Sequence, residues 1–83
     1  MSLYDQIQQT YMESLKTGET PKRIFLPEAA LDELLADRSL SSVWDPYIRD
    51  KWGQKLLGLP LSKTNGIIAL EVGNKIIPLG EPT

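Results

Sequence analysis

The chain has 83 residues, which is enough for one domain and too few for two lobes with a cleft between them. Hydrophobic residues make up 41% of it, charged residues 24%, and the formal net charge is −2, a composition typical of a globular domain. It has no histidine and no cysteine, which excludes disulfides, thiolate nucleophiles, imidazole bases and the common zinc sites. We therefore expect one small domain, residues 1–83, that is not an enzyme.

An amphipathic helix is predicted over residues 2–16, because its apolar side chains occupy about half of the helical wheel. Ser2 and Asp5 have the spacing of an N-terminal cap, and Gly18 stands where a left-handed C-terminal cap is needed. The apolar stripe consists of Leu3, Tyr4, Ile7, Tyr11, Met12 and Leu15. Residues 17–21 are predicted to form a linker, so the stripe packs either on its own sheet or against another chain.

A strand and a second helix are predicted next. Residues 22–26 are partly β-branched and aromatic and lie between two prolines, which indicates a strand. Pro27 suits the first position of a helix, where a missing N–H costs nothing, and the helix is expected to end near Asp37 or Arg38. Its apolar side is formed by Ala30, Leu31, Leu34 and Leu35.

Residues 41–53 contain half of the aromatic residues of the chain. Asp45 followed by Pro46 has the pattern of a helix start, with the aspartate as N-cap and the proline at the first position. Gly53 is suited to the other end. We therefore predict a short helix of about two turns here.

The remaining residues favour β structure. Residues 55–61 are an apolar run broken by glycine and proline, and residues 62–66 form a cluster of turn residues. Residues 67–72 and 75–79 are predicted strands joined by a two-residue turn with glycine first.

Pairing Val72 with Lys75 in this hairpin places Leu70 opposite Ile77 on one apolar face. Pro78 then falls at a position that needs no hydrogen bond to its partner strand, which predicts that its strand is an edge of the sheet.

The predicted fold is α+β. A small antiparallel sheet of three or four strands ends in the C-terminal β-hairpin, is packed by helices, and is preceded by the N-terminal amphipathic helix. Residues 22–80 form the expected body and residues 81–83 a loose tail.

Paired carboxylates are the only common acid–base machinery that the composition leaves, and Asp32, Glu33 and Asp37 are the local candidates. Acids opposite a leucine stripe are more often a solvated helix face. Asp45 and Asp50 lack the spacing of a calcium loop. We expect no catalytic residue, no metal site, no cofactor and no small-molecule substrate.

The aromatic residues and the first helix suggest a binding function instead. Tryptophan and tyrosine often anchor protein–protein contacts, because they bury a large area at little conformational cost. The candidate interface residues are Trp44, Tyr47, Trp52, Tyr4, Ile7 and Tyr11. The alternative for the two tryptophans is internal packing, whereas Tyr47 is expected at the surface. The partner is either another protein or a second copy of the chain.

An alternative function is the binding of single-stranded nucleic acid, in which basic residues hold the backbone and Trp52 and Tyr47 stack on bases. The candidate residues are Lys22, Arg23, Arg49, Lys51 and Lys55. The acidic total charge makes this alternative less favoured than protein binding.

Residues 55–61, KLLGLPL, and residues 24–37 resemble a strand-helix unit and an LLGxP segment of the major capsid proteins of tailed phages. The layout of the chain is similar to that of small phage and prophage proteins. This resemblance implies a compact accessory protein with a binding role, and it transfers no site residue. The N-terminus has no signal-peptide pattern and no segment has the length of a membrane span, so we expect a cytoplasmic protein, in the host cytoplasm or the virion if it is phage-encoded.

Overall fold

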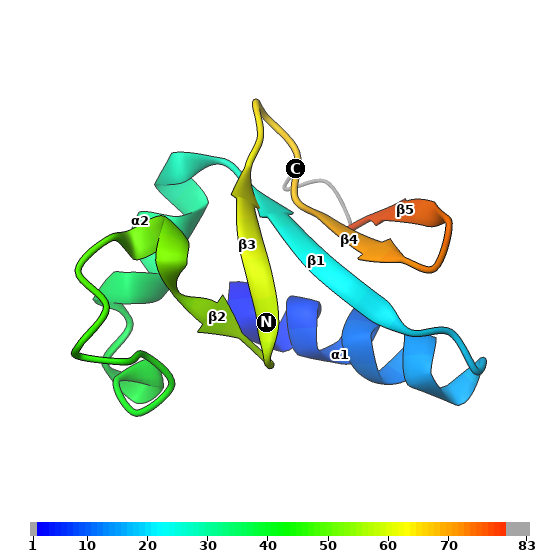
Figure 1. Ribbon diagram of the computed structural model, residues 1–83, viewed down its shortest axis with the longest axis horizontal. Coiled ribbons are helices and arrows are strands. Elements are labelled where there is room, and N and C mark those ends of the chain that lie inside the picture. The colour runs from blue at the N-terminus through cyan, green and yellow to red at the C-terminus, as the bar shows by residue number, and fades with distance from the viewer. Residues whose placement is uncertain (1, 80–83) are drawn as a thin grey trace.

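The computed structural model describes residues 2–79, which form two α-helices and one five-stranded sheet (Figure 1). The helices are α1 (Leu3–Lys16) and α2 (Glu28–Ala36), with the 3-10 turns η1 (Arg38–Leu40) and η2 (Lys51–Gly53). The strands are β1 (Pro21–Leu26), β2 (Lys55–Leu56), β3 (Leu59–Lys63), β4 (Ala69–Val72) and β5 (Lys75–Pro78). The α+β class and the C-terminal hairpin are confirmed. The predicted tail, residues 81–83, lies outside the described residues.

The sheet is mixed, so the prediction of an antiparallel sheet of three or four strands is wrong. Its strand order is β2-β3-β1-β4-β5, and β1 pairs with β3 in parallel, with Ile24 beside Leu61. Parallel neighbours need a long crossover connection, which here contains α2, both 3-10 turns and β2. Residues 55–61, predicted as one apolar β segment, contain two strands that run in opposite directions.

The reversal takes place at Leu57 and Gly58, which join β2 to β3. Both residues have positive φ, 55° and 77°, as a type I′ hairpin turn requires. Lys55 pairs with Pro60 and Leu56 with Leu59 on either side of this turn. Leucine tolerates the left-handed region poorly, which is why the sequence did not indicate a turn here.

The β4–β5 hairpin has the predicted register. Val72 pairs with Lys75 and Leu70 with Ile77, and the Leu79 N–H donates to the Ile68 carbonyl at 2.9 Å. Gly73 has φ 59° at the first turn position. β5 is an edge strand, as Pro78 predicted.

Helix α1 has the predicted ends. The Asp5 N–H donates to the Ser2 hydroxyl at 3.2 Å, and Gly18 has φ 82° after the last turn. The helix packs on its own sheet, where it contacts β1 and β4, and in Figure 1 it passes behind the lower end of β3. Its buried face is centred on Ile7 and Ser14, and the Ser14 hydroxyl donates to the Thr10 carbonyl at 2.9 Å.

The apolar stripe of α1 is narrower than predicted. Met12 is 49% exposed and Leu15 is 46% exposed, because both lie away from the side that faces the sheet. The linker that follows is not a free hinge. The Gly73 N–H donates to the Thr20 carbonyl at 3.2 Å and Lys75 pairs with Glu19 at 3.1 Å, so residues 17–20 are fastened to the β4–β5 turn.

Helix α2 begins one residue later than predicted. Pro27 has an extended backbone, with ψ 157°, and its carbonyl accepts the N–H groups of Ala30 and Leu31. Pro27 is therefore the capping residue and not the first helical residue. Leu31 and Leu34 of α2 are buried with Ile7 in one core. This core lies on the sheet face formed by Ile24, Leu26, Leu56, Leu59, Leu61, Leu70 and Val72.

Candidate functional site

Residues 41–53 do not form the predicted two-turn helix. They make a tight turn at Asp45, whose carboxylate Oδ1 accepts the Tyr47 N–H at 2.9 Å, and then the single 3-10 turn η2. Asp50 starts η2 by accepting the Trp52 N–H at 3.0 Å. Asp45 therefore caps a turn and not a helix, and a second aspartate, Asp50, caps η2.

The physical reason is the side chain of Gln54, which is buried and holds the turn from inside. Its Oε1 accepts the Asp45 N–H at 2.9 Å, and its Nε2 donates to the Asp45 carbonyl at 2.9 Å and to the Ile48 carbonyl at 3.3 Å. The Asp45 carbonyl also accepts the Ile48 N–H at 3.2 Å, which closes a single turn. The Gln54 amide thus holds this turn on both sides, at Asp45 and at Ile48.

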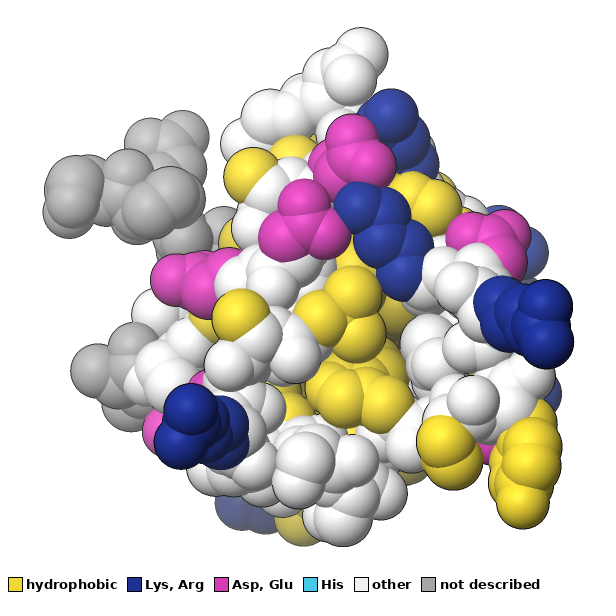
Figure 2. Space-filling view, turned by 90° about the vertical axis from the view of Figure 1, so that its left-hand side faces the viewer, with side chains coloured by type: hydrophobic (Ala, Val, Ile, Leu, Met, Phe, Trp, Pro, Cys, Tyr) yellow, Lys and Arg dark blue, Asp and Glu magenta, His cyan; other side chains and the backbone are white. Residues whose placement is uncertain are grey.

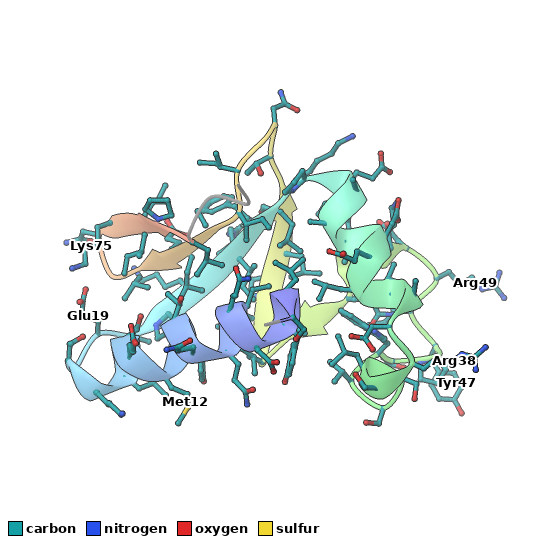
Figure 3. All side chains as sticks on the ribbon, turned by 180° about the vertical axis from the view of Figure 1, so that it is seen from behind. Met12, Glu19, Arg38, Tyr47, Arg49 and Lys75 are labelled. Atoms are coloured by element: carbon teal, nitrogen blue, oxygen red, sulfur yellow. The ribbon has the colours of Figure 1, made fainter. Side chains whose placement is uncertain are left out.

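Tyr47 stands at the tip of this fixed loop and is 91% exposed. Figure 3 shows its ring pointing away from the body at the same end of the molecule as the side chains of Arg38 and Arg49. Both arginines are exposed, and within residues 2–79 neither takes part in an ion pair. The loop therefore presents a phenol together with uncommitted guanidinium groups to solvent.

The two tryptophans form the base of the loop and not its surface. Trp44 and Trp52 are half-buried and pack against the core. The indole Nε1 of Trp44 is buried and has no hydrogen-bond partner among the described residues. Figure 2 shows this side of the molecule, where apolar side chains are visible below a group of acidic and basic ones. The tryptophans anchor the loop and leave Tyr47 as its exposed aromatic residue.

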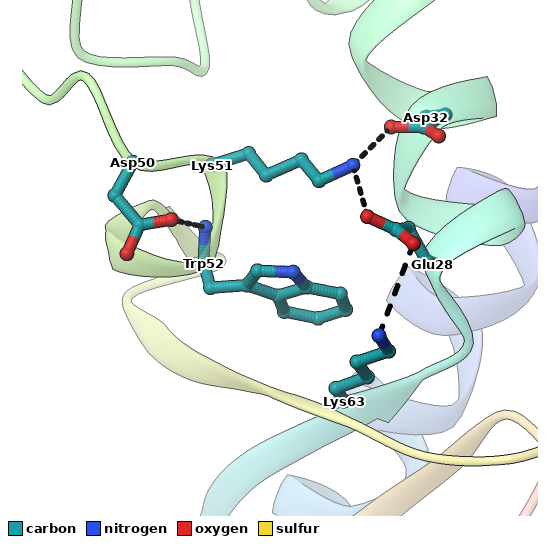
Figure 4. Close-up of polar contacts among 6 residues, drawn as sticks. All are labelled: Glu28, Asp32, Asp50, Lys51, Trp52 and Lys63. Atoms are coloured by element: carbon teal, nitrogen blue, oxygen red, sulfur yellow. Dashed lines mark hydrogen bonds and ion pairs between the residues drawn. The ribbon is translucent and has the colours of Figure 1, made fainter.

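A group of ion pairs joins η2 to α2. Lys51 Nζ lies 2.8 Å from Glu28 Oε2 and 2.8 Å from Asp32 Oδ1, and Lys63 Nζ lies 3.8 Å from Glu28 Oε1 (Figure 4). The hydrogen bond from Lys51, together with its charge, lowers the pKa of Glu28 below the ordinary 4.5. The hydrogen bonds to Asp32 and Glu28 raise the pKa of Lys51. These charges fasten the base of the loop to the helix.

The five basic residues proposed for nucleic-acid binding lie on different elements. Lys51 is engaged by two carboxylates on α2, and Arg23 donates to Ser62 at 2.6 Å and lies 3.9 Å from Glu71. The positions are Lys22 and Arg23 on β1, Arg49 in the loop, Lys51 in η2 and Lys55 on β2. The structure therefore pairs two of the five with acids, and of the five only Arg49 belongs to the same loop as Tyr47.

The three candidate residues of α1 have different environments. Ile7 is fully buried in the core, where it contributes to packing within the chain. Tyr4 and Tyr11 are partly buried against the same core. The structure places none of the three next to Tyr47, and the apolar side of α1 is occupied by the chain's own sheet.

Two of the three candidate catalytic carboxylates have structural partners. Asp32 binds Lys51, and Asp37 accepts the Ser39 hydroxyl at 2.7 Å and its N–H at 3.0 Å, which lowers the pKa of Asp37 below 3.8. Glu33 is exposed on α2. Across residues 2–79 no group of three or more histidine, cysteine or acidic residues is placed to hold a metal ion.

Gln54 is the residue of the loop that sequence analysis missed. A glutamine before a strand is usually solvated, and no local spacing marks this one as the partner of a backbone nine residues earlier. Arg38 was also missed, because it was assigned only to the end of α2.

Comparison with known proteins gives no match to a family model, to a curated protein sequence or to a solved structure. The likeness of residues 55–61 to phage capsid segments therefore stays a prediction from the sequence. Among the described helices, none combines the length and the apolar character needed to cross a membrane.

Proposed function

We propose that this domain is a small protein-binding module whose contact with its partner is centred on Tyr47. The observation that carries the proposal is that Tyr47 is 91% exposed at the tip of a loop whose backbone is held by Gln54. On a flexible loop, an exposed aromatic side chain alone would not indicate a binding site. On a loop fixed from inside, little conformational entropy is lost on binding, which favours affinity.

The side chains around Tyr47 support a protein partner of a particular kind. Tyrosine and arginine are among the residues most enriched at the centres of protein interfaces, and Arg38 and Arg49 lie at the same end of the molecule as Tyr47 (Figure 3). The partner would offer an apolar pocket for the phenol ring and carboxylates for the guanidinium groups. The phage-type accessory role implied by the resemblance is compatible with such a module.

The proposal is tested by site-specific photocrosslinking. A benzophenone amino acid replaces Tyr47 in one variant and Ile67 in a control, because Ile67 is also exposed, at 55%, and lies outside the loop. In an extract of the organism that encodes the chain, we expect the first variant to crosslink one discrete protein. An excess of wild-type domain should suppress the crosslink, and an excess of the Tyr47→Ser domain should not. Equal crosslinking from both positions would contradict the proposal.

A fluorescence titration of the wild-type domain distinguishes protein binding from the nucleic-acid alternative. Because Lys51 and Arg23 are paired with acids, we expect the tryptophan fluorescence to stay unchanged when a single-stranded oligonucleotide is added at low salt. Quenching that disappears at high salt would favour the alternative.

A further inference from the structure

The solvent face of α1 is independent of the Tyr47 loop and has an unusual order of side chains. Residues at spacings of three and four lie together on one side of a helix. This side carries, in order, Asp5, Gln8, Gln9, Met12, Glu13 and Lys16, which line one shallow depression. Ile7 and Ser14, on the other side, are buried against the sheet. Met12, 49% exposed, projects outward in Figure 3.

This face is complementary to itself when a second α1 runs in the opposite direction. With a two-fold axis between Gln9 and Met12, Asp5 of one copy faces Lys16 of the other. The same arrangement sets Gln8 opposite Glu13, so that an amide can donate to a carboxylate. Every contact occurs twice by symmetry. A parallel arrangement would instead set Asp5 against Asp5 and Lys16 against Lys16.

We propose that a second copy of this chain covers this face, as an antiparallel α1–α1 homodimer. The charge order decides the direction, and the antiparallel helix dipoles favour the same arrangement. The two Met12 side chains lie near the axis and supply the apolar contact. The predicted apolar stripe could cover either the chain's own sheet or another chain, and its member Ile7 is buried within the chain. The proposed self-association uses the solvent side of α1, which shares only Met12 with that stripe.

The size of the face sets the strength of the dimer. A helix of 14 residues is about 21 Å long, and one of its sides offers less than the roughly 800 Å² per partner of a stable interface. The dimer is therefore weak and forms reversibly at high protein concentration. The charge pairs at its ends are solvent-exposed, so their main contribution is to fix direction and register.

Sedimentation velocity from about 20 µM to about 1 mM tests the proposal. The wild-type chain is expected to change reversibly from monomer to dimer over this range. Met12→Lys brings two ammonium groups together at the axis and should raise the dissociation constant about tenfold or more. Ile67→Lys adds the same charge at an equally exposed position off this face and should leave the constant unchanged. Circular dichroism verifies that both variants are folded.

A charge exchange identifies the arrangement itself. Asp5→Lys and Lys16→Asp should each weaken the dimer, because each sets like charges opposite one another. When the two variants are mixed, both end contacts become Lys–Asp pairs and a heterodimer should form. A wild-type chain that stays monomeric at about 1 mM, or a mixture that does not associate, would overturn the proposal. Tyr47→Ser should leave dimerisation unchanged, which keeps this result separate from the protein-binding test.

Discussion

The β4–β5 hairpin and the loop of residues 41–54 differ in how far apart in the sequence the residues that fix their structure lie. In the hairpin, a glycine with positive φ reverses the chain, and the register then follows from neighbouring pairs such as Val72 with Lys75. In the loop, the backbone at Asp45 is held by Gln54, nine residues later. The first region was predicted correctly and the second was not. A turn signal determines structure when its partners are adjacent, and it misleads when a distant side chain satisfies the same backbone groups.

The largest expected effect on stability tests whether the β4–β5 hairpin stabilises the domain through the face that is buried in the core. Leu70 is fully buried opposite Ile77 and beside Ile24, so Leu70→Ala should lower the free energy of unfolding by about 3 kcal/mol. Ile76→Ala, on the same hairpin but 56% exposed, should cost less than about 0.5 kcal/mol. Urea denaturation followed by circular dichroism measures both. Similar losses would mean that the hairpin is not anchored by its buried face.

A slightly smaller effect is expected in the loop. Gln54→Met keeps most of the side-chain volume but removes the amide that pairs with the Asp45 N–H and the Ile48 carbonyl, while the Asp45 carbonyl keeps only the Ile48 N–H at 3.2 Å. The loss of these three partly buried hydrogen bonds should cost about 2 kcal/mol. The environment of Trp44 should change with it, which near-ultraviolet circular dichroism detects. A Gln54→Met protein of unchanged stability would show that the loop does not depend on this amide.

A matched pair of glycine substitutions separates conformational strain from packing. Gly73→Ala forces a positive φ on alanine, with its nearest non-neighbouring atom 3.9 Å away on Glu19, and should cost about 1 kcal/mol. Gly53→Ala has an ordinary φ but places a methyl group 3.2 Å from Ile48 Cγ2, a side-chain atom that can shift. We therefore expect the smaller loss at Gly53, in thermal unfolding of both variants. The reverse order would mean that the loop is the more rigidly packed region.

The smallest expected effect concerns the ion pairs between η2 and α2. The pKa of Glu28 is lowered in the folded state, so its contribution to stability is complete above pH 4.5 and is lost as the pH falls through the folded-state value. In Lys51→Met this acid-dependent loss should become smaller, because the ammonium that lowers the pKa is absent. Unfolding midpoints measured between about pH 3 and pH 7 test this. An unchanged pH profile would show that Lys51 does not stabilise the carboxylate.

Among the candidate site residues too, some positions were predicted correctly and others were not. Tyr47 was expected at the surface and is exposed, because a polar-tipped ring on a turn has no core to reach. Ile7 was grouped with the interface residues, yet it packs on the sheet of its own chain. Periodicity shows that a helix side is apolar, and it does not show which surface covers that side.

The sequence by itself determined the two helices, the caps of α1, the C-terminal hairpin with its register, and the edge position of the Pro78 strand, since each depends on residues a few positions apart. Only the tertiary structure decided the parallel pairing of β1 with β3, the hidden turn at Leu57 and Gly58, and the course of the loop below Tyr47. These features arise from contacts between distant segments. There, burial of apolar side chains in one core and the pairing of every buried backbone group outweigh the preferences of single residues.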